Sequence, residues 1–343
     1  MGCVNSRYCN GFFAALLKLS QNMINFAPLF FRVKCDMSSS SLLHPRNLHH
    51  GQYDFAELTK ALPDLQRFIC SNKTGGQTID FGDNAAVVAL NQAILARYYN
   101  IRFWQLPQGY LCPPVPGRAD YVHYIADLLA RSYPTIPLGK QVKLLDIGTG
   151  ANLIYPIIAS QSYGWQVYGS DIDPVAVKVA KTIVASNPSL QQLVHIVQQT
   201  GNTIFSGIIQ HQQQFHLTMC NPPFYASAAE AEAASSRKWI NLGKEQQGGA
   251  RNFAGQQHEL WCVGGELAFI SQMIRESALF KQQVCWFTTL VSQHKHIKPL
   301  RKLLNSVGAV QTDVIEMRQG QKVSRTLAWS FLTFSQQQQW PII

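Results

Sequence analysis

Residues 144–152, Leu-Leu-Asp-Ile-Gly-Thr-Gly-Ala-Asn, decide the fold. An apolar run ends in Asp146, and two glycines follow before a second apolar stretch begins. Gly148 and Gly150 allow the sharp backbone turn that joins a strand to a helix. Because nucleotide-like ligands bind beyond the carboxyl ends of strands in open α/β sheets, this turn predicts a binding crevice.

Predicted strands and helices alternate from Val142 onward. Such alternation is typical of a mostly parallel sheet with helices on both faces. The last two strands follow one another without a helix, which indicates an antiparallel edge. The predicted strands are 142–147, 165–171, 193–198, 214–220, 283–290, 309–317 and 326–334, and the predicted helices are 151–160, 174–187, 264–279 and 296–306.

A second carboxylate follows about twenty residues after the glycine turn. Asp171 ends an apolar strand and can accept from both hydroxyls of a ribose, whereas Asp173 precedes Pro174 and is expected to cap the next helix. The turn lacks the G-x-G-x-x-G spacing that a pyrophosphate needs. S-adenosylmethionine carries no phosphate and fits a D-x-G-x-G turn, in which Asp146 either accepts from the ligand or orients the turn.

The stretch Asn221-Pro222-Pro223-Phe224 closes the strand predicted at 214–220. An aromatic amine is a weak nucleophile because its lone pair is delocalised into the ring. The Asn221 side-chain oxygen and the Pro222 carbonyl can accept its two N–H groups, and Phe224 offers a face for stacking. Pro222 and Pro223 bring no competing N–H. The motif therefore indicates methyl transfer to a planar nitrogen, with a base flipped out of its helix.

Composition narrows the class of protein. Lys and Arg exceed Asp and Glu by 29 to 19, so nucleic acid is a plausible partner, although a basic protein that binds none is the alternative. None of the eight cysteines forms a C-x-x-C pair, which indicates reduced thiols in the cytoplasm. No apolar run is long enough for a membrane helix. His294 and His296 lack a second ligand pair, so no metal site is expected.

The chain divides into segments of different character. The first residues contain two apolar stretches and the start MGCVNS, which fits the Gly2 myristoylation pattern; we expect a dispensable extension with Met37 as the functional start. Helices are predicted at 83–99 and 121–132. The predicted segments are the extension 1–40, a helical front section 41–140, the sheet domain 141–335 and a tail 336–343 that is expected to fray.

With these motifs in place, the chain closely resembles the bacterial large-subunit ribosomal RNA adenine-N6 methyltransferases of the RlmF type. A human U6 small nuclear RNA adenine methyltransferase is a more distant relative. The resemblance implies a Rossmann-like class I methyltransferase fold with an RNA-binding front section. The matching segments are LHPRN at 43–47, LCPPVPGRADYVHYIADLL at 111–129, LLDIGTGANLIYPII at 144–158, CNPPF at 220–224, RKWINLG at 237–243, AGQQHELWCVGGE at 254–266 and GQKVSRTLAWSF at 320–331.

The resemblance also implies roles for single residues. Arg118 is expected to reach the carboxylate of S-adenosylmethionine or the mouth of the site. Gly148 and Asp171 match cofactor contacts, and Asn221 matches a contact shared by cofactor and substrate. Residues 226–258 suit a loop that orders on RNA. The partner implied is large-subunit ribosomal RNA or its assembly intermediate. The candidates for contacts with RNA phosphates, which orient the RNA without specifying sequence, are Arg46, Arg237, Lys238, Lys322 and Arg325.

Two other classes of protein stay open. Protein glutamine methyltransferases share N-P-P at this strand end, although they usually place Tyr where Phe224 stands here. A non-catalytic RNA-binding protein can keep the fold, but intact cofactor and substrate motifs argue against it. The RNA substrate can also be a structured RNA other than ribosomal RNA.

Overall fold

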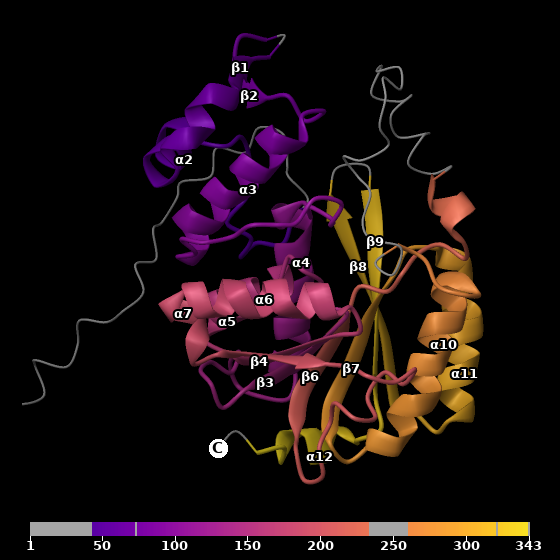
Figure 1. Cartoon of the computed structure of the whole chain (residues 1–343). Coiled ribbons are helices and arrows are strands. Elements are labelled where there is room, and N and C mark those ends of the chain that lie inside the picture. Colours follow the sequence, from indigo (N-terminus) through magenta and orange to yellow (C-terminus); the bar gives the residue numbers. More distant parts are fainter. Residues whose placement is uncertain (1–42, 73, 233–259, 320–321, 342–343) are drawn as a thin grey trace, which may run out of the picture. The chain divides into compact units, whose positions relative to one another are not determined.

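The computed structural model describes residues 43–72, 74–232, 260–319 and 322–341 (Figure 1). They belong to one compact unit, Ser41–Ile343. The predicted extension 1–40 and most of the predicted loop 226–258 lie outside the described residues. Within the described residues, no helix is long and apolar enough to cross a lipid bilayer.

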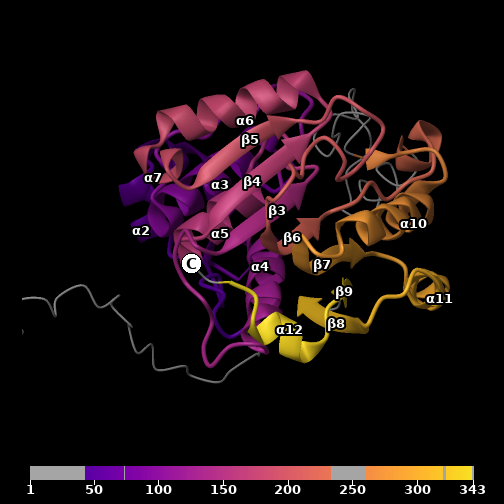
Figure 2. The ribbon, with the colours of Figure 1, turned by 90° about the horizontal axis from the view of Figure 1, so that it is seen from below.

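Seven strands form one sheet in the order β5-β4-β3-β6-β7-β9-β8 (Figure 2). The first five in this order pair in parallel, and β9 pairs antiparallel with both β7 and β8. The predicted mostly parallel sheet and its antiparallel edge are thus confirmed. The strands are β3 (Lys143–Ile147), β4 (Gln166–Asp171), β5 (Val194–Gln198), β6 (Phe215–Cys220), β7 (Val284–Val291), β8 (Gln311–Gln319) and β9 (Lys322–Ser330).

Both faces of the sheet are covered, as Figure 2 shows. Because successive strand residues point to opposite faces, Leu144 joins the core with α4 and α5, and Leu145 joins the core with α10 and α11. Double coverage explains why the central strands are continuous apolar runs. The helices are α4 (Val115–Ala130), α5 (Ile154–Tyr163), α6 (Pro174–Ser186), α7 (Pro188–Gln191), α10 (Gly265–Ser277) and α11 (Ile297–Ser306).

The front section shares its core with the sheet domain. The Trp104 indole donates to the carbonyl of Asn152 at the glycine turn, and Asn187 after α6 accepts from Arg102 and Phe103. This section therefore borders the predicted crevice. Its other elements are α2 (Phe55–Ala61), η1 (Pro63–Phe68), the hairpin of β1 (Ile69–Ser71) and β2 (Gln77–Ile79), and α3 (Asn84–Tyr99). The sheet domain also contains two short 3-10 helices, η2 (Ala278–Phe280) and η3 (His294–His296).

Several boundaries differ from the sequence prediction, by three residues or more in α4, α5 and β9. Helix α4 begins at Val115 rather than 121, because Pro116 is tolerated in a first turn. Helix α5 begins at Ile154, because Leu153 has φ +54° and still belongs to the turn. Strand β9 begins four residues earlier than predicted, and the hairpin of β1 and β2 was not predicted, since three-residue strands carry too little alternation.

The described part of the tail, residues 336–341, is ordered by packing and does not fray as expected. Helix α12 (Phe334–Gln338) begins with a capping box between Thr333 and Gln336. Gln337 is fully buried, Trp340 is 7% exposed, and the Tyr133 hydroxyl donates to the Trp340 carbonyl at 3.1 Å. The prediction relied on the glutamine-rich composition and did not consider that Trp340 packs into the core.

This packing predicts that Trp340→Ala lowers the free energy of unfolding by about 3 kcal/mol, because a large buried aromatic leaves a cavity. Urea unfolding measures the change, with the exposed Gln339→Ala as control. A loss for Trp340→Ala no larger than that of the control would show that the tail contributes nothing to the core.

Candidate cofactor and substrate site

The glycine turn is fixed to the neighbouring strand. The backbone N–H groups of Gly148 and Thr149 both donate to the Ser170 carbonyl, at 2.9 and 3.0 Å. Gly148 and Gly150 adopt φ +70° and +65°, which side chains rarely tolerate. A Cβ built on Gly148 meets no atom within 4 Å, so the space beside it is open. The turn thus leaves room for a ligand directly against its backbone.

Asp171, at the end of β4, holds the other side of this turn. Its carboxylate accepts from the N–H of Gly150 at 2.8 Å and from that of Asp173 at 3.0 Å. Burial raises the pKa of Asp171, and these two N–H donors oppose the rise. Asp173 accepts from Val175 and caps α6, as predicted. A third backbone N–H, that of Ile172, also acts on this carboxylate, which still has room for a further donor.

Asp146 is completely buried beneath the turn and neither of its oxygens has a hydrogen-bond partner. Burial raises the pKa of Asp146 to about 7; the Asp171 carboxylate adds to the rise, whereas Thr149 and Arg118 oppose it. The Thr149 hydroxyl lies close enough for this effect but does not meet hydrogen-bond geometry. A buried acceptor without a donor costs stability, so this site stores free energy that a ligand can release.

The N-P-P-F stretch lies next to the glycine turn. Strands β3 and β6 pair so that Ile147 stands opposite Cys220, which brings Asn221 beside Gly148 at the sheet's edge. The Asn221 side-chain oxygen is buried and has no partner. Pro222 is buried, and Pro223 and Phe224 are half-buried.

The backbone beyond these prolines is held by a short parallel contact. Phe224 and Tyr225 donate to the Leu260 carbonyl at 3.0 and 3.1 Å, and Tyr225 forms an isolated bridge with Trp261. The segment AGQQHELWC thus supports the motif, at least in its described part.

Four buried side-chain oxygens among the described residues lack a hydrogen-bond partner, and all four belong to this site. The other buried atoms without a partner are nitrogens scattered through the fold. Acceptors gathered at one sheet edge fit a ligand that brings N–H and O–H donors. The four atoms are Asp146 Oδ1, Asp146 Oδ2, Thr149 Oγ1 and Asn221 Oδ1.

Arg118 borders the same crevice from α4. It donates to the Tyr155 hydroxyl at 2.7 Å, and its guanidinium carbon lies 5.5 Å from the centre of the Tyr155 ring. No carboxylate of the described residues lies within ion-pair distance of Arg118, so its remaining donors can take an anion. Sequence reasoning missed Thr149 and Tyr155, although both lie in or beside the glycine motif.

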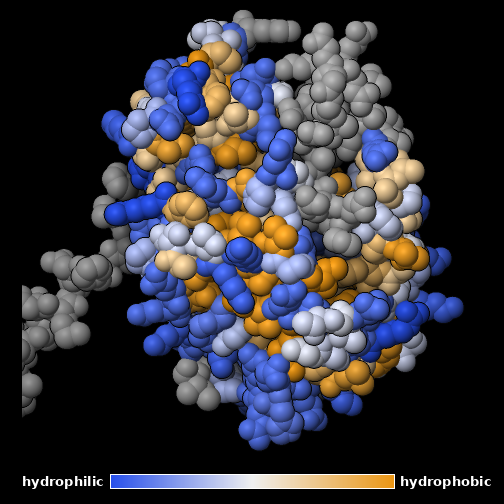
Figure 3. All heavy atoms as spheres, in the orientation of Figure 1, coloured by the Kyte–Doolittle hydropathy of each residue, from blue (hydrophilic) through white to orange (hydrophobic). Residues whose placement is uncertain are grey.

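The rim of the crevice is partly apolar. Ile172 and Val175, which flank the start of α6, are 52% and 49% exposed. Figure 3 shows apolar side chains at the surface of the central part of this face, where Figure 1 places α6. An apolar rim beside hydrogen-bond acceptors suits a heteroaromatic ligand.

The predicted phosphate contacts have different surroundings. Arg46 is bound internally, to Asp127 at 2.8 Å, to the Tyr163 hydroxyl and to the His123 carbonyl. The Arg325 side chain is 16% exposed and lies 3.5 Å from Glu316. Lys322 begins β9 but its side chain is not described, and Arg237 and Lys238 lie outside the described residues.

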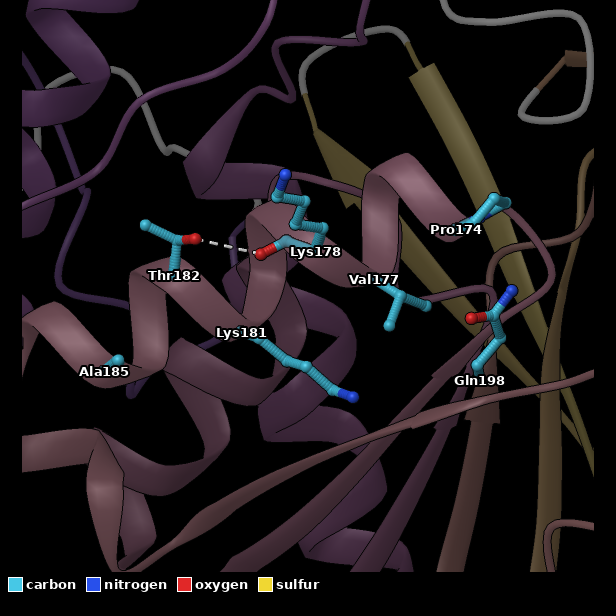
Figure 4. A pocket seen from close by; sticks show the side chains of 7 residues that line it. All are labelled: Pro174, Val177, Lys178, Lys181, Thr182, Ala185 and Gln198. Carbon is cyan, nitrogen blue, oxygen red and sulfur yellow. Dashed lines mark hydrogen bonds between the residues drawn. The ribbon is translucent and has the colours of Figure 1, made fainter.

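An open groove of about 440 Å³ lies elsewhere, between α6 and β5 (Figure 4). Lys178 and Lys181 project from its helical side, and Gln198 from the end of β5. No residue of the glycine turn or of N-P-P-F lines it, so we place the chemistry at the partnerless oxygens instead. Among the described residues, no group of three or more His, Cys, Asp or Glu is arranged to hold a metal ion.

The fold and site define a class: a Rossmann-like class I methyltransferase. A family described as RNA methyltransferase matches residues 37–333. Ribosomal RNA large subunit methyltransferase F of Psychromonas ingrahamii is 54% identical over 301 residues, which cover 87% of this chain and 97% of that protein. The protein of the same name from Klebsiella pneumoniae is 52% identical, with 84% and 95% covered. The chain belongs to this RNA methyltransferase family, within the ribosomal RNA large subunit methyltransferase F group.

Solved structures of human METTL16 share the fold. Its catalytic domain in complex with MAT2A 3′UTR hairpin 6 has a TM-score of 0.71 at 29% identity, covering 86% of this chain and 98% of that one. Its N-terminal domain in complex with SAH has a TM-score of 0.66 at 25% identity, covering 85% and 99%.

Asp146 predicts a pH-dependent stability. A folded pKa of about 7 exceeds the unfolded value of about 3.9, so only the folded state keeps the proton between these values. Stability therefore falls as pH rises from 4 to 7. Relative to Asp146→Asn, we expect the wild type to lose about 4 kcal/mol across this window, from about 3 pH units at about 1.4 kcal/mol each.

Urea unfolding of both proteins without cofactor measures this difference. Burial lowers the pKa of His49, His123 and His216 to about 4, 3 and 4, which makes stability rise with pH over part of the same range. Both proteins share these histidines, so their effect cancels. A difference that stays constant between pH 4 and 7 would contradict the assignment.

Proposed function

We propose that this chain transfers a methyl group from S-adenosylmethionine to the N6 amine of an adenine in large-subunit ribosomal RNA. The observation that carries the proposal is the set of partnerless buried oxygens where the glycine turn meets N-P-P-F. The relatives' names refer to large-subunit ribosomal RNA, and the METTL16 structures contain RNA hairpins or SAH.

The residues at the turn fit the cofactor. S-adenosylmethionine supplies an electrophilic methyl group, and the demethylated cofactor leaves as a neutral thioether. The methylated amine releases one proton to give the neutral product. Asp171 keeps lone pairs for ribose hydroxyls, Asp146 can accept from a ligand N–H, and Arg118 has free donors for a carboxylate. The open space at Gly148 admits the ligand against the backbone.

The N-P-P-F residues hold the target amine. Asn221 Oδ1 accepts one N–H and the Pro222 carbonyl accepts the other, which directs the nitrogen lone pair away from the protein and toward the cofactor side. Phe224 stacks on the base. Catalysis is then positioning together with stabilisation of the developing charge on the amine.

The RNA approaches through the front section and the basic side chains. Phosphate contacts from Arg46, Arg237, Lys238, Lys322 and Arg325 are part of the proposal. Arg46 and Arg325 must exchange or share their internal carboxylate partners to make them. A ribosomal substrate implies action in the cytoplasm.

A glutamine methyltransferase is the alternative, because an amide nitrogen offers the same two N–H groups. The large share of the chain that matches an RNA methyltransferase family favours RNA. Radiolabelled methyl transfer to ribosomal RNA, compared with transfer to ribosomal proteins and release factors, separates the two. Label in protein alone would reject the RNA assignment.

Asn221→Ala is expected to lower turnover at least about 100-fold, because it removes an acceptor that aligns the nucleophile. The test is mass mapping of N6-methyladenine in large-subunit ribosomal RNA of Klebsiella pneumoniae that lacks its 52% identical relative. We expect this chain to restore one modified adenine and Asn221→Ala to leave it unmodified at equal protein level. Full restoration by the variant would refute the role of Asn221.

Phe224 predicts an effect on RNA binding. Loss of base stacking in Phe224→Ala is expected to raise the KM for RNA about tenfold, since stacking contributes about 1–3 kcal/mol per base. Phe224→Tyr keeps an aromatic face and is the matched control, with a KM close to wild type. Equal KM values for all three proteins would exclude stacking on this side chain.

A further inference from the structure

Helix α4 reaches the end of β6 through one buried hydroxyl. Tyr121 is completely buried, and its oxygen accepts from the backbone N–H of Cys220 at 3.4 Å. Cys220 is the residue immediately before Asn221. The contact therefore acts on the last peptide of β6 before the N-P-P-F stretch.

The direction of the hydrogen bonds around Tyr121 is determined. The Thr288 hydroxyl on β7 donates to the Thr218 carbonyl at 2.7 Å, which uses its only proton. The Tyr121 hydroxyl, 2.7 Å from Thr288 Oγ1, must then be the donor between these two. A chain of three bonds thus runs from Cys220 through Tyr121 and Thr288 back to Thr218.

These hydrogen bonds also link β6 to β7 close to the site, beyond the two paired positions of their backbone ladder. The register of β6 and β7 pairs Phe215 with Val284 and Leu217 with Trp286. Nearer the site, side-chain hydroxyls reinforce the contact, and Thr218, Thr288 and Tyr121 are all fully buried. Burial raises the pKa of Tyr121 well above its usual value, so the hydroxyl keeps its proton.

Helix α4 also carries Arg118, the cation on the proposed cofactor side of the site. Arg118 precedes Tyr121 by three residues, and Arg118 and Tyr121 both contact Tyr155: Arg118 donates to its hydroxyl, and the Tyr121 ring meets its ring edge-on at 5.6 Å. One turn of α4 thus contacts both the cofactor side and the backbone under Asn221.

We propose that Tyr121 is a positioning residue for methyl transfer, which holds the Cys220 backbone so that Asn221 and the Pro222 carbonyl keep their alignment with the cofactor. The inference rests on the proposed function of these acceptors. Small displacements of aligned groups reduce rates strongly. Because the bond from Cys220 is long, we expect an effect smaller than that of losing Asn221 itself.

Single-turnover methyl transfer at saturating cofactor and RNA tests the proposal. The RNA is large-subunit ribosomal RNA purified from the Klebsiella strain described above. Tyr121→Phe is expected to slow the transfer about tenfold while the Kd for S-adenosylmethionine stays within about twofold of wild type. Thr288→Val is expected to act alike, and Thr288→Ser, which keeps the hydroxyl, to restore the rate.

Two comparisons separate positioning from stability. Tyr99→Phe removes another buried hydroxyl, which contacts His49 at 2.9 Å far from the motif, and should lower the Tm without slowing transfer. The double variant Tyr121→Phe/Thr288→Val should be no slower than the slower single variant, because both interrupt one chain of bonds. If Tyr121→Phe fails to fold, the Thr288→Val and Thr288→Ser pair gives the same answer.

The outcomes distinguish this inference from the function it rests on. A wild-type protein that leaves no N6-methyladenine in this RNA overturns the proposed function and the inference together. Normal wild-type activity with full-rate Tyr121→Phe and Thr288→Val overturns the inference alone. A rate loss equal to that of Tyr99→Phe also overturns it, since the hydroxyl would then serve stability only.

Discussion

The parallel pairing of β3 with β6 is the constraint on which the site depends. With Ile147 opposite Cys220, two segments that are 73 residues apart in the sequence end side by side at the carboxyl ends of the strands. Neither segment makes a site by itself: the glycine turn offers space and a buried carboxylate, and N-P-P-F offers an acceptor and an aromatic face. Parallel strands require crossover connections, so this meeting point depends on α5 and α6 packing on one face and α10 on the other.

Burial gives that meeting point its chemical character. The sheet is covered on both faces, and its strands pair in hydrogen-bonded ladders. Buried side-chain oxygens without donors are costly, and in the described part of the chain they gather only where the two motifs meet. The raised pKa of Asp146 has the same origin, because a carboxylate that lacks donors in a dry site holds its proton more tightly. A ligand rich in N–H and O–H groups repays the missing hydrogen bonds.

Much of the fold could be predicted from sequence because the strands of the sheet domain are long and the helices between them are periodic. All seven strands of the sheet appear close to their predicted positions, and Asp173 caps α6 as expected. The misplaced boundaries have local causes, such as the left-handed Leu153 and the proline at the start of α4. The prediction that the tail frays was wrong, because it rested on four consecutive glutamines. Burial of the single Trp340 holds the tail in place.

The sequence predicted the motif residues of the site but not the residues that support them, and the reason is physical. Motifs identify residues that touch a ligand, since those follow strands in a recognisable order, but supporting residues are chosen by three-dimensional proximity. Tyr121 lies about a hundred residues before Cys220, and no local pattern links them. The phosphate candidates show what charge alone does not reveal: the Arg46 guanidinium binds Asp127 and Tyr163, which fixes the LHPRN segment to α4 and α5. Since α4 also carries Arg118 and Tyr121, this anchor supports the geometry of the proposed site whether or not Arg46 meets a phosphate.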